Sequence, residues 1–153
     1  MAEPQGLYHA SAITRVDYAL RAIVPAVWIV RVQAPVSLDE ESEPEPDVAV
    51  VPGRPGDYRD SHPSHPALVV EVSESSLELH RSGKGSLYAR AGIPDYWIVN
   101  LVEGFVEVYR DPAPNAAAAF GYSYRSVGRL EPPATLAPLA LGGERMAVAD
   151  LLP

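Results

Sequence analysis

Apolar and polar residues follow a helical spacing near the start of the chain. Between residues 10 and 24 the apolar positions recur every three or four residues, and Arg15, Asp17 and Arg21 fall between them. This spacing is typical of an amphipathic helix that packs one face on a core. Pro25 ends the helix, because proline cannot continue it. The apolar positions are Ile13, Val16, Leu20, Ile23 and Val24.

Beyond Pro25 the pattern changes to short apolar runs separated by prolines, glycines and acidic residues. Runs of this length that are rich in β-branched and aromatic residues predict strands. The runs at 48–51 and 67–73 are apolar on both faces, which indicates central strands of a sheet that is covered on both sides. The predicted strands cover residues 27–33, 48–51, 67–73, 95–100, 105–110 and 119–127.

A second helix is predicted between the third and fourth of these strands. A pair of serines suits the start of the helical segment, and Gly92 followed by Pro94 suits its end. Gly83 and Gly85 each cost about 1 kcal/mol inside a helix, so the regular helix is predicted to begin only near Ser82. One or two further helical turns are predicted at the end of the chain, over residues 148–152.

These elements predict one α/β domain over residues 1–153, with a mixed central sheet flanked by helices. The N-terminal helix lies on one side of the sheet, and the second helix packs against the sheet. The length of 153 residues and a hydrophobic content of 47% supply enough material for the core of one such domain.

Cysteine is absent, which excludes disulfides, thiolate metal sites and a cysteine nucleophile. A bound metal would need oxygen or imidazole ligands, and this favours hard cations such as Mg²⁺ or Mn²⁺. No apolar run is long enough to span a bilayer, and the first residues lack the pattern of a signal peptide. The sequence therefore predicts a cytoplasmic protein with no membrane partner.

The net charge of −8 disfavours a protein that coats DNA without regard to sequence, since such proteins carry a basic face. It leaves room for a nuclease with a local basic cleft, because metal ions neutralise acidic residues at such a site.

Glu71 lies in the middle of the apolar run "PALVVEVS". An ionised carboxylate that is buried without a partner is strongly destabilising, so Glu71 needs an ion pair or a cation. Side chains alternate along a strand, and Glu71 therefore shares one face with Val69 and Ser73. Asp47 opens the preceding predicted strand, and the two carboxylates lie side by side if these strands are neighbours. Two adjacent carboxylates raise each other's pKa unless a divalent cation neutralises them.

Lys84 falls on the same helical stripe as Leu87, Tyr88 and Ala91, and this stripe faces the core. A lysine there can direct its ammonium group to the two carboxylates, either as an ion-pair partner or as a group that orients a water molecule. Two acids and a lysine beside a hard cation form a set of groups suited to phosphodiester hydrolysis.

Each of these residues also has a simpler interpretation when it is taken alone. Asp47 is then a turn or strand-start residue after Pro46, Glu71 is the partner of an arginine, and Lys84 is a solvated surface residue. Other polar and aromatic residues are weaker candidates. His62 and His65 as a metal pair, His9 as a phosphate contact and Trp97 as a base-stacking residue are each less favoured than a structural role.

The segments "EPDVAVV", "PALVVEVSESSL", "GKGSLYARAGIPDYWIVN" and "VEVYR" occur in this order along the chain. Together they resemble the Uma-type putative restriction endonucleases, a branch of the PD-(D/E)xK nuclease superfamily. The resemblance implies a restriction endonuclease-like fold and a magnesium-dependent DNA endonuclease. It implies Asp47 and Glu71 as ligands of Mg²⁺ or Mn²⁺ and Lys84 as the catalytic residue that supports the attacking water.

In the superfamily's basic pattern the lysine comes two residues after the second acid, where this chain has Ser73. In this family the following helix supplies it, which suits Lys84. An aspartate often precedes the lysine, where this chain has His80. Members also usually begin with a longer N-terminal region, so the resemblance predicts that this chain lacks that element.

Two functions follow from these observations. The first is metal-dependent cleavage of DNA by a protein that, like many such nucleases, forms a homodimer to cut both strands. The alternative is a catalytically inactive nuclease-like fold that acts as a binding or assembly module.

Overall fold

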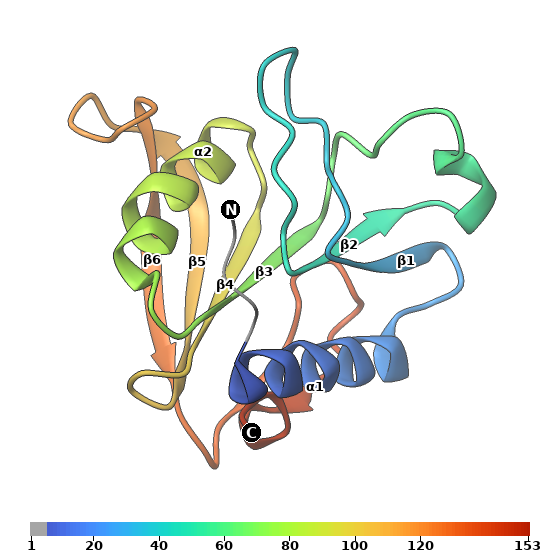
Figure 1. Cartoon of the computed structure of the whole chain (residues 1–153), viewed down its shortest axis with the longest axis vertical. Helices are drawn as coiled ribbons and strands as arrows, with labels where there is room; N and C mark the ends of the chain where they lie inside the picture. Colours follow the sequence, from blue (N-terminus) through green and yellow to red (C-terminus); the bar gives the residue numbers. More distant parts are fainter. Residues whose placement is uncertain (1–5) are drawn as a thin grey trace.

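A six-stranded mixed sheet forms the centre of the protein in its computed structural model, which describes residues 6–153 (Figure 1). The strands are ordered in space as they are along the chain, from β1 to β6. All neighbours pair antiparallel except β3 and β4, which are parallel. The strands are β1 Trp28–Val32, β2 Val48–Pro52, β3 Leu68–Ser73, β4 Asp95–Asn100, β5 Phe105–Pro114 and β6 Tyr122–Leu130.

The parallel pair requires a crossover connection, because the chain must return to the edge of the sheet at which β3 began. This crossover contains the π-helix η2, Leu79–Lys84, followed directly by the α-helix α2, Gly85–Arg90. It covers one face of the sheet (Figure 1). The crossover is the segment that carries Lys84, so its path decides where this lysine lies.

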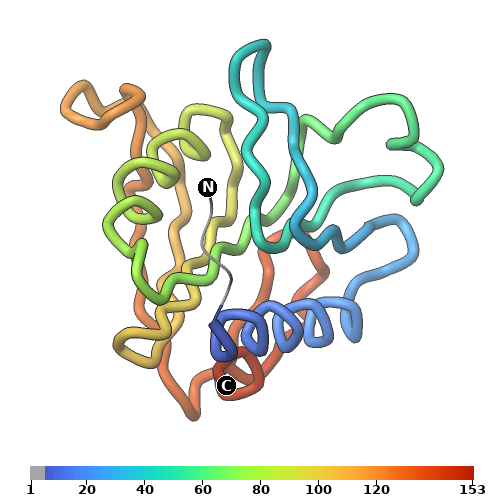
Figure 2. Tube along the Cα trace, viewed as in Figure 1, coloured from blue at the N-terminus to red at the C-terminus, as the bar shows by residue number. Residues whose placement is uncertain are grey.

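The helix α1, Leu7–Ile23, packs on the opposite face together with the C-terminal segment. Figure 2 shows this red segment beside the first turns of the blue helix. The C-terminal segment contains the short strands β7 Thr135–Leu136 and β8 Met146–Ala147 and the 3₁₀ helix η3 Val148–Leu151. A further 3₁₀ helix, η1 Pro55–Tyr58, lies between β2 and β3. None of the helices in the described part of the chain has the length and apolar character needed to cross a membrane.

The two faces of β3 belong to two separate core clusters. Val70 and Val72 pack on the side of α1, whereas Val69 packs on the side of α2. Glu71 and Ser73 share the α2 side with Val69, as the period of two along a strand requires. The predicted alternation in "LVVEVS" is confirmed, and so is the placing of Trp97 in the core.

The helical segment begins at residue 77, directly after the pair of serines, as predicted. The prediction is wrong in the type of helix, because residues from Leu79 to Lys84 form a π-helix, and regular α-helix begins at Gly85 rather than near Ser82. A Cβ at Gly85 would lie 3.4 Å from the backbone oxygen of His80 and 3.7 Å from the Tyr96 ring, which is ordinary van der Waals contact.

Candidate active site

Asp47 and Glu71 meet where β2 begins. The register pairs Val48 with Val70, so Asp47, one residue before β2, lies opposite Glu71. The Asp47 backbone N–H donates to Glu71 Oε1 at 3.1 Å, and the Val72 N–H donates to Asp47 Oδ2 at 2.7 Å. The Asp47 side chain thus replaces the backbone acceptor that an extended β2 would have offered to β3. The strands β2 and β3 are neighbours, which was the condition for the two acids to lie side by side.

Lys84 reaches the same group from η2. Its Nζ donates to Glu71 Oε2 at 2.9 Å, and the Tyr88 hydroxyl donates to the same oxygen at 2.9 Å. Only 1% of the Glu71 side chain is exposed, compared with 29% of the Lys84 side chain. The carboxylate is therefore buried with a cationic partner, and its partner retains access to solvent.

The electrostatics of the two acids, Asp47 and Glu71, differ from those of carboxylates on an exposed surface. Burial and the nearby charge of Glu71 raise the pKa of Asp47 to about 6, although the Val72 N–H, His9 and Lys84 act in the opposite direction. The buried Glu71 and the partly buried Asp47, accompanied by one lysine, leave one excess negative charge when both acids are ionised. A cation bound there would be favoured by this excess.

His9 lies in the first part of α1 and faces the same place. Its Nε2 is 3.0 Å from the Val72 backbone oxygen and 3.7 Å from Asp47 Oδ2. Because a carbonyl oxygen only accepts, Nε2 carries the proton in this contact. Its Nδ1 is buried, and no hydrogen-bond partner for it is present among residues 6–153. From the sequence His9 is only a weak candidate for a phosphate contact, since nothing local to α1 indicates how near β3 it lies.

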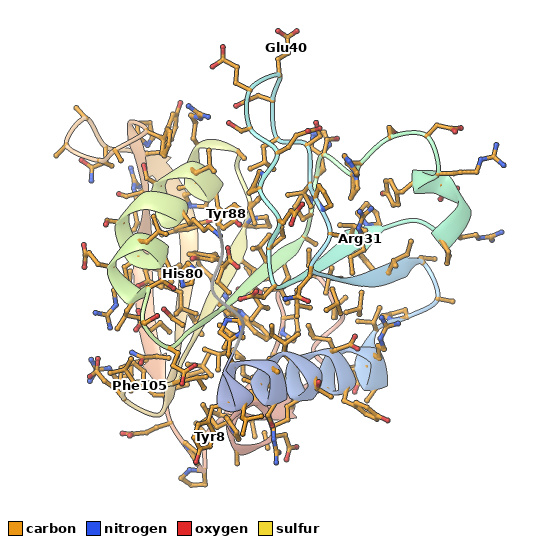
Figure 3. All side chains as sticks on the ribbon, viewed as in Figure 1. Tyr8, Arg31, Glu40, His80, Tyr88 and Phe105 are labelled. Carbon is orange, nitrogen blue, oxygen red and sulfur yellow. The ribbon has the colours of Figure 1, made fainter. Side chains whose placement is uncertain are left out.

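Two further residues of the site were not assigned by the sequence analysis. Tyr88 lies four residues after Lys84, and this spacing on a helix was the available signal. Burial, followed by the charge of Glu71, raises the pKa of Tyr88 well above its usual value, so the hydroxyl remains a donor. His80 lies on η2 itself (Figure 3), and it is buried. Burial lowers the pKa of His80, and its Nδ1 lies 3.0 Å from Ser73 Oγ.

The Tyr88 contact gives a first testable prediction. Tyr88→Phe removes a hydrogen bond to a buried carboxylate and should lower the free energy of unfolding by about 1.5–3 kcal/mol. Tyr124→Phe is the matched control, because its hydroxyl donates to the neutral backbone oxygen of Ile93 and should cost only about 0.5–1.5 kcal/mol. Urea denaturation of both variants measures the difference. A loss in Tyr88→Phe no larger than that in Tyr124→Phe would contradict the assigned contact.

Asp47 and Glu71 fit a hard cation in donor type and in charge, because carboxylate oxygens are the usual protein ligands of Mg²⁺. They do not form a complete cage. In the part of the chain that the structure describes, no three histidine, aspartate or glutamate side chains form a group that could hold a metal ion. Mg²⁺ commonly binds through one or two carboxylates and keeps several waters, so two acids are a sufficient protein contribution.

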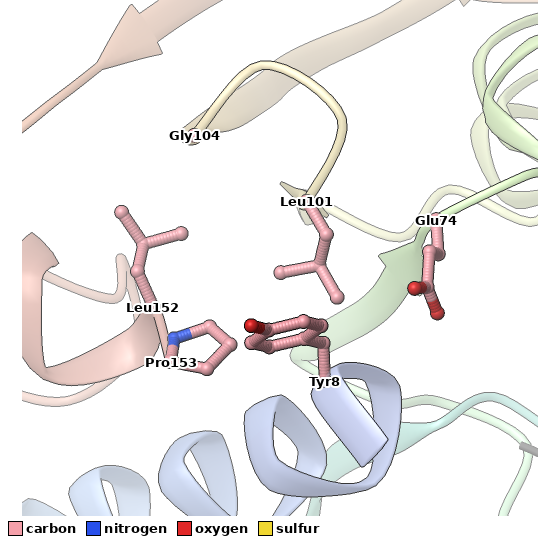
Figure 4. A pocket seen from close by; sticks show the side chains of 6 residues that line it. All are labelled: Tyr8, Glu74, Leu101, Gly104, Leu152 and Pro153. Carbon is pink, nitrogen blue, oxygen red and sulfur yellow. The ribbon is translucent and has the colours of Figure 1, made fainter. Parts of the chain in front are cut away.

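Other candidates lie outside this cluster. His62 and His65 are exposed on the connection between η1 and β3. A pocket of about 210 Å³ lies beside the start of α1 (Figure 4). It offers one carboxylate, Glu74, among mostly apolar side chains, and none of Asp47, Glu71 and Lys84 lines it. The pocket is therefore separate from the groups that carry the chemistry.

The fold and the cluster define an α/β protein in which two acids and a lysine from three separate segments converge at the central strands. The chain matches the model of the Uma2 family, described as putative restriction endonuclease, over residues 1–149, and it belongs to this family. This confirms the resemblance read from the sequence motifs.

A solved structure supports the same fold. The chain is similar to the crystal structure of a putative nuclease belonging to DUF820 from Anabaena variabilis, with a TM-score of 0.73 and 16% sequence identity. The similarity covers 98% of this chain and 82% of that chain. The predicted restriction endonuclease-like fold, a mixed sheet flanked by helices, is confirmed. No curated protein matches the chain.

Proposed function

We propose that this protein is a metal-dependent endonuclease that hydrolyses phosphodiester bonds of DNA. One observation carries the proposal. Asp47 and Lys84 both contact Glu71, with the Asp47 backbone nitrogen 3.1 Å from one carboxylate oxygen and Lys84 Nζ 2.9 Å from the other. Membership in the Uma2 family, described as putative restriction endonuclease, supports the same reaction class.

Asp47 and Glu71 are the residues that would bind Mg²⁺ or Mn²⁺. When bound, such an ion activates water and stabilises the negative charge that develops on the phosphate. The protein contributes rigidity, because Glu71 lies on a fully buried strand and Asp47 is fixed by the Val72 N–H. A divalent ion would also reverse the excess negative charge of the cluster, which favours an anionic substrate.

Lys84 is the residue that orients the attacking water. Its ammonium group has three donors, and one of them is directed at Glu71 Oε2. Because its side chain is partly exposed, the remaining donors can reach a water molecule at the edge of the site. The Glu71 carboxylate fixes the lysine, and the Tyr88 hydroxyl fixes the carboxylate.

DNA as the substrate must be recognised locally, because the whole chain has a net charge of −8. Cleavage of both strands would require two such sites, which is the reason to propose a homodimer. Analytical ultracentrifugation with and without a short duplex tests this, and a monomer in both conditions would contradict it.

Calorimetric titration with Mg²⁺ and Mn²⁺, together with cleavage of a supercoiled plasmid, tests the proposed function. The protein should bind the ion and nick the plasmid only when the ion is present. Glu71→Gln keeps the shape of the side chain and removes its charge, so it should lose both properties. The matched control is Glu74→Gln, which makes the same change at an exposed position and should retain both.

The alternative, an inactive nuclease-like fold that acts as a binding or assembly module, is favoured by the acidic net charge. It predicts no ion binding, or ion binding that Glu71→Gln leaves unchanged. Either result would overturn the enzyme proposal.

A further inference from the structure

A second buried carboxylate, Glu107, lies in the same row of the sheet as Glu71. The registers pair Glu71 with Ile98 and Ile98 with Glu107, so the two acids stand on β3 and β5 with β4 between them. Neighbouring strands are about 4.8 Å apart, which separates their backbones by about 10 Å. Both side chains point to the face that η2 and α2 cover.

The surroundings of Glu107 are closed. Arg81 binds it through two nitrogens, with Nε 3.0 Å from Oε1 and the terminal nitrogen 2.6 Å from Oε2. The Tyr109 hydroxyl and Asn100 Nδ2 donate at 2.6 and 2.9 Å. Although burial opposes ionisation, these hydrogen bonds hold the pKa of Glu107 below its usual value. A carboxylate with its acceptor positions occupied in this way is an anchor rather than a site for a ligand.

The cation of each carboxylate comes from the same short helix. Arg81 and Lys84 are three residues apart on η2, yet Arg81 contacts Glu107 on β5 and Lys84 contacts Glu71 on β3. On an α-helix, side chains three apart share a face and lie about 5–6 Å from one another at Cβ. The wider turn of a π-helix lets them diverge toward acids two strands apart.

His80, the residue before Arg81 in η2, is hydrogen-bonded to the sheet as well. The Tyr96 hydroxyl donates to the His80 backbone oxygen at 2.8 Å, and the His80 ring contacts Ser73. The π-helix is therefore fixed at β3, β4 and β5. Two of the contacts between η2 and the sheet are ion pairs, Lys84 with Glu71 and Arg81 with Glu107, and we call the second one the clamp.

We propose that Arg81 and Glu107 are positioning residues that place Lys84 against Glu71. The clamp attaches η2 to β5 through Arg81. This attachment fixes the rotation of η2, and the rotation of η2 directs Lys84 toward Glu71 on β3. Its effect on catalysis rests on the proposed function, whereas its effect on the contact between Lys84 and Glu71 does not.

A matched pair of variants separates positioning from stability. Arg81→Gln breaks the clamp, and Arg110→Gln breaks a similar buried pair, in which Arg110 Nε lies 3.0 Å from Asp95. The two arginines are exposed to similar degrees, 34% and 28%, and both acids are buried. Both variants should show a similar fall in the urea midpoint. If lost stability alone lowered the activity, it would lower the activity of both variants equally.

The kinetic expectation is a split between the two variants. Arg81→Gln should lower kcat for plasmid cleavage by about 10- to 100-fold, because a small displacement of a reacting group has an effect of this size. Its KM should stay within about twofold of the wild type, as expected when an interaction of the transition state alone is lost. Arg110→Gln should leave both within about twofold. A raised KM with unchanged kcat in Arg81→Gln would make Arg81 a DNA contact and overturn the proposal.

Crystal structures of the two variants give a readout that does not depend on activity. The 2.9 Å contact between Lys84 Nζ and Glu71 should be lost in Arg81→Gln and kept in Arg110→Gln. Arg81→Lys, which keeps the charge but not the two-nitrogen geometry, should recover part of kcat and serves if Arg81→Gln does not fold. If the wild type fails to cleave DNA, the proposed function fails, and the crystal structures alone test whether the clamp positions Lys84. A contact between Lys84 and Glu71 that is unchanged in Arg81→Gln would overturn this positioning role.

Discussion

Replacing Lys84 with methionine should lower the rate of DNA cleavage by about 10²- to 10⁴-fold, the range expected for loss of a group that assists proton transfer. Methionine is similar in length and keeps the apolar stem, but it has no ammonium group to direct at Glu71 or at a water molecule. The ligand carboxylates remain, so ion binding by calorimetry should persist. Loss of ion binding together with activity would instead make Lys84 a structural residue.

The same replacement should also destabilise the fold. Only 1% of the Glu71 side chain is exposed, and Lys84 is its cationic partner. Removing one member of a buried ion pair costs about 3–5 kcal/mol, because the other charge stays buried without compensation. Since the Tyr88 hydroxyl and the Asp47 N–H still donate to Glu71, a loss of about 3 kcal/mol is expected, at the lower end of this range.

The double variant Lys84→Met with Glu71→Gln separates the two effects. Neutralising Glu71 removes the unpaired charge, so the free energy of unfolding should return to within about 1 kcal/mol of the wild type. Activity should not return, because both an acid and the lysine are then absent. Urea denaturation and plasmid cleavage of the single and double variants complete the cycle. A double variant less stable than Lys84→Met would contradict the ion pair as described.

Replacing Asp47 with asparagine should stabilise the protein at pH 8 and abolish ion binding and cleavage. Burial and the charge of Glu71 raise the pKa of Asp47 from 3.8 to about 6. Below pH 3.8 the carboxyl is protonated in the folded and unfolded states, and the fold bears no cost for its charge. Between pH 3.8 and about 6 the unfolded chain ionises this group while the folded protein keeps it protonated, so stability falls over this window and stays lower above it.

The expected gain follows from this shift. One pKa unit corresponds to about 1.4 kcal/mol, and the coupling of Asp47 to Glu71 makes an increase of about 1–3 kcal/mol the expected range above pH 7. Asparagine keeps a carbonyl oxygen that can accept from the Val72 N–H, so the local hydrogen bond survives.

Urea denaturation at several pH values from 4 to 8, in buffer without divalent ions, measures this effect. The difference between Asp47→Asn and the wild type should be small near pH 4, grow up to about pH 6 and level off above it. Asp60→Asn, at an exposed position, is the control and should change stability by less than about 0.5 kcal/mol at every pH. A difference for Asp47→Asn that does not vary with pH would contradict the raised pKa.

Local patterns were sufficient for the six strands of the central sheet, for α1 and for the direction of Glu71. The period of two in β3 placed Glu71 on one face and Val70 and Val72 on the other, and the structure has the same arrangement. The helical spacing predicted a helix at residues 10–24, and the observed α1, Leu7–Ile23, begins earlier and ends one residue earlier. These properties depend on neighbours along the chain, which a pattern records.

Other features depended on contacts between distant segments. Nothing near Arg81 indicates that its partner is Glu107, and the two glycines after it pointed to a delayed helix rather than to a π-helix. His9 is separated from Val72 by most of the N-terminal half of the chain, and their contact exists only because α1 packs across β3.

The sequence by itself determined the strands, the two helical regions and the set of acids and lysine that the family resemblance singled out. The tertiary structure decided how Glu71 is compensated, since Lys84, Tyr88 and the Asp47 N–H come from different elements. It also decided that Arg81 and Lys84 diverge from one helix to two strands. The physical reason is that periodicity fixes which face a side chain occupies, whereas burial and pKa depend on what the rest of the chain places against that face.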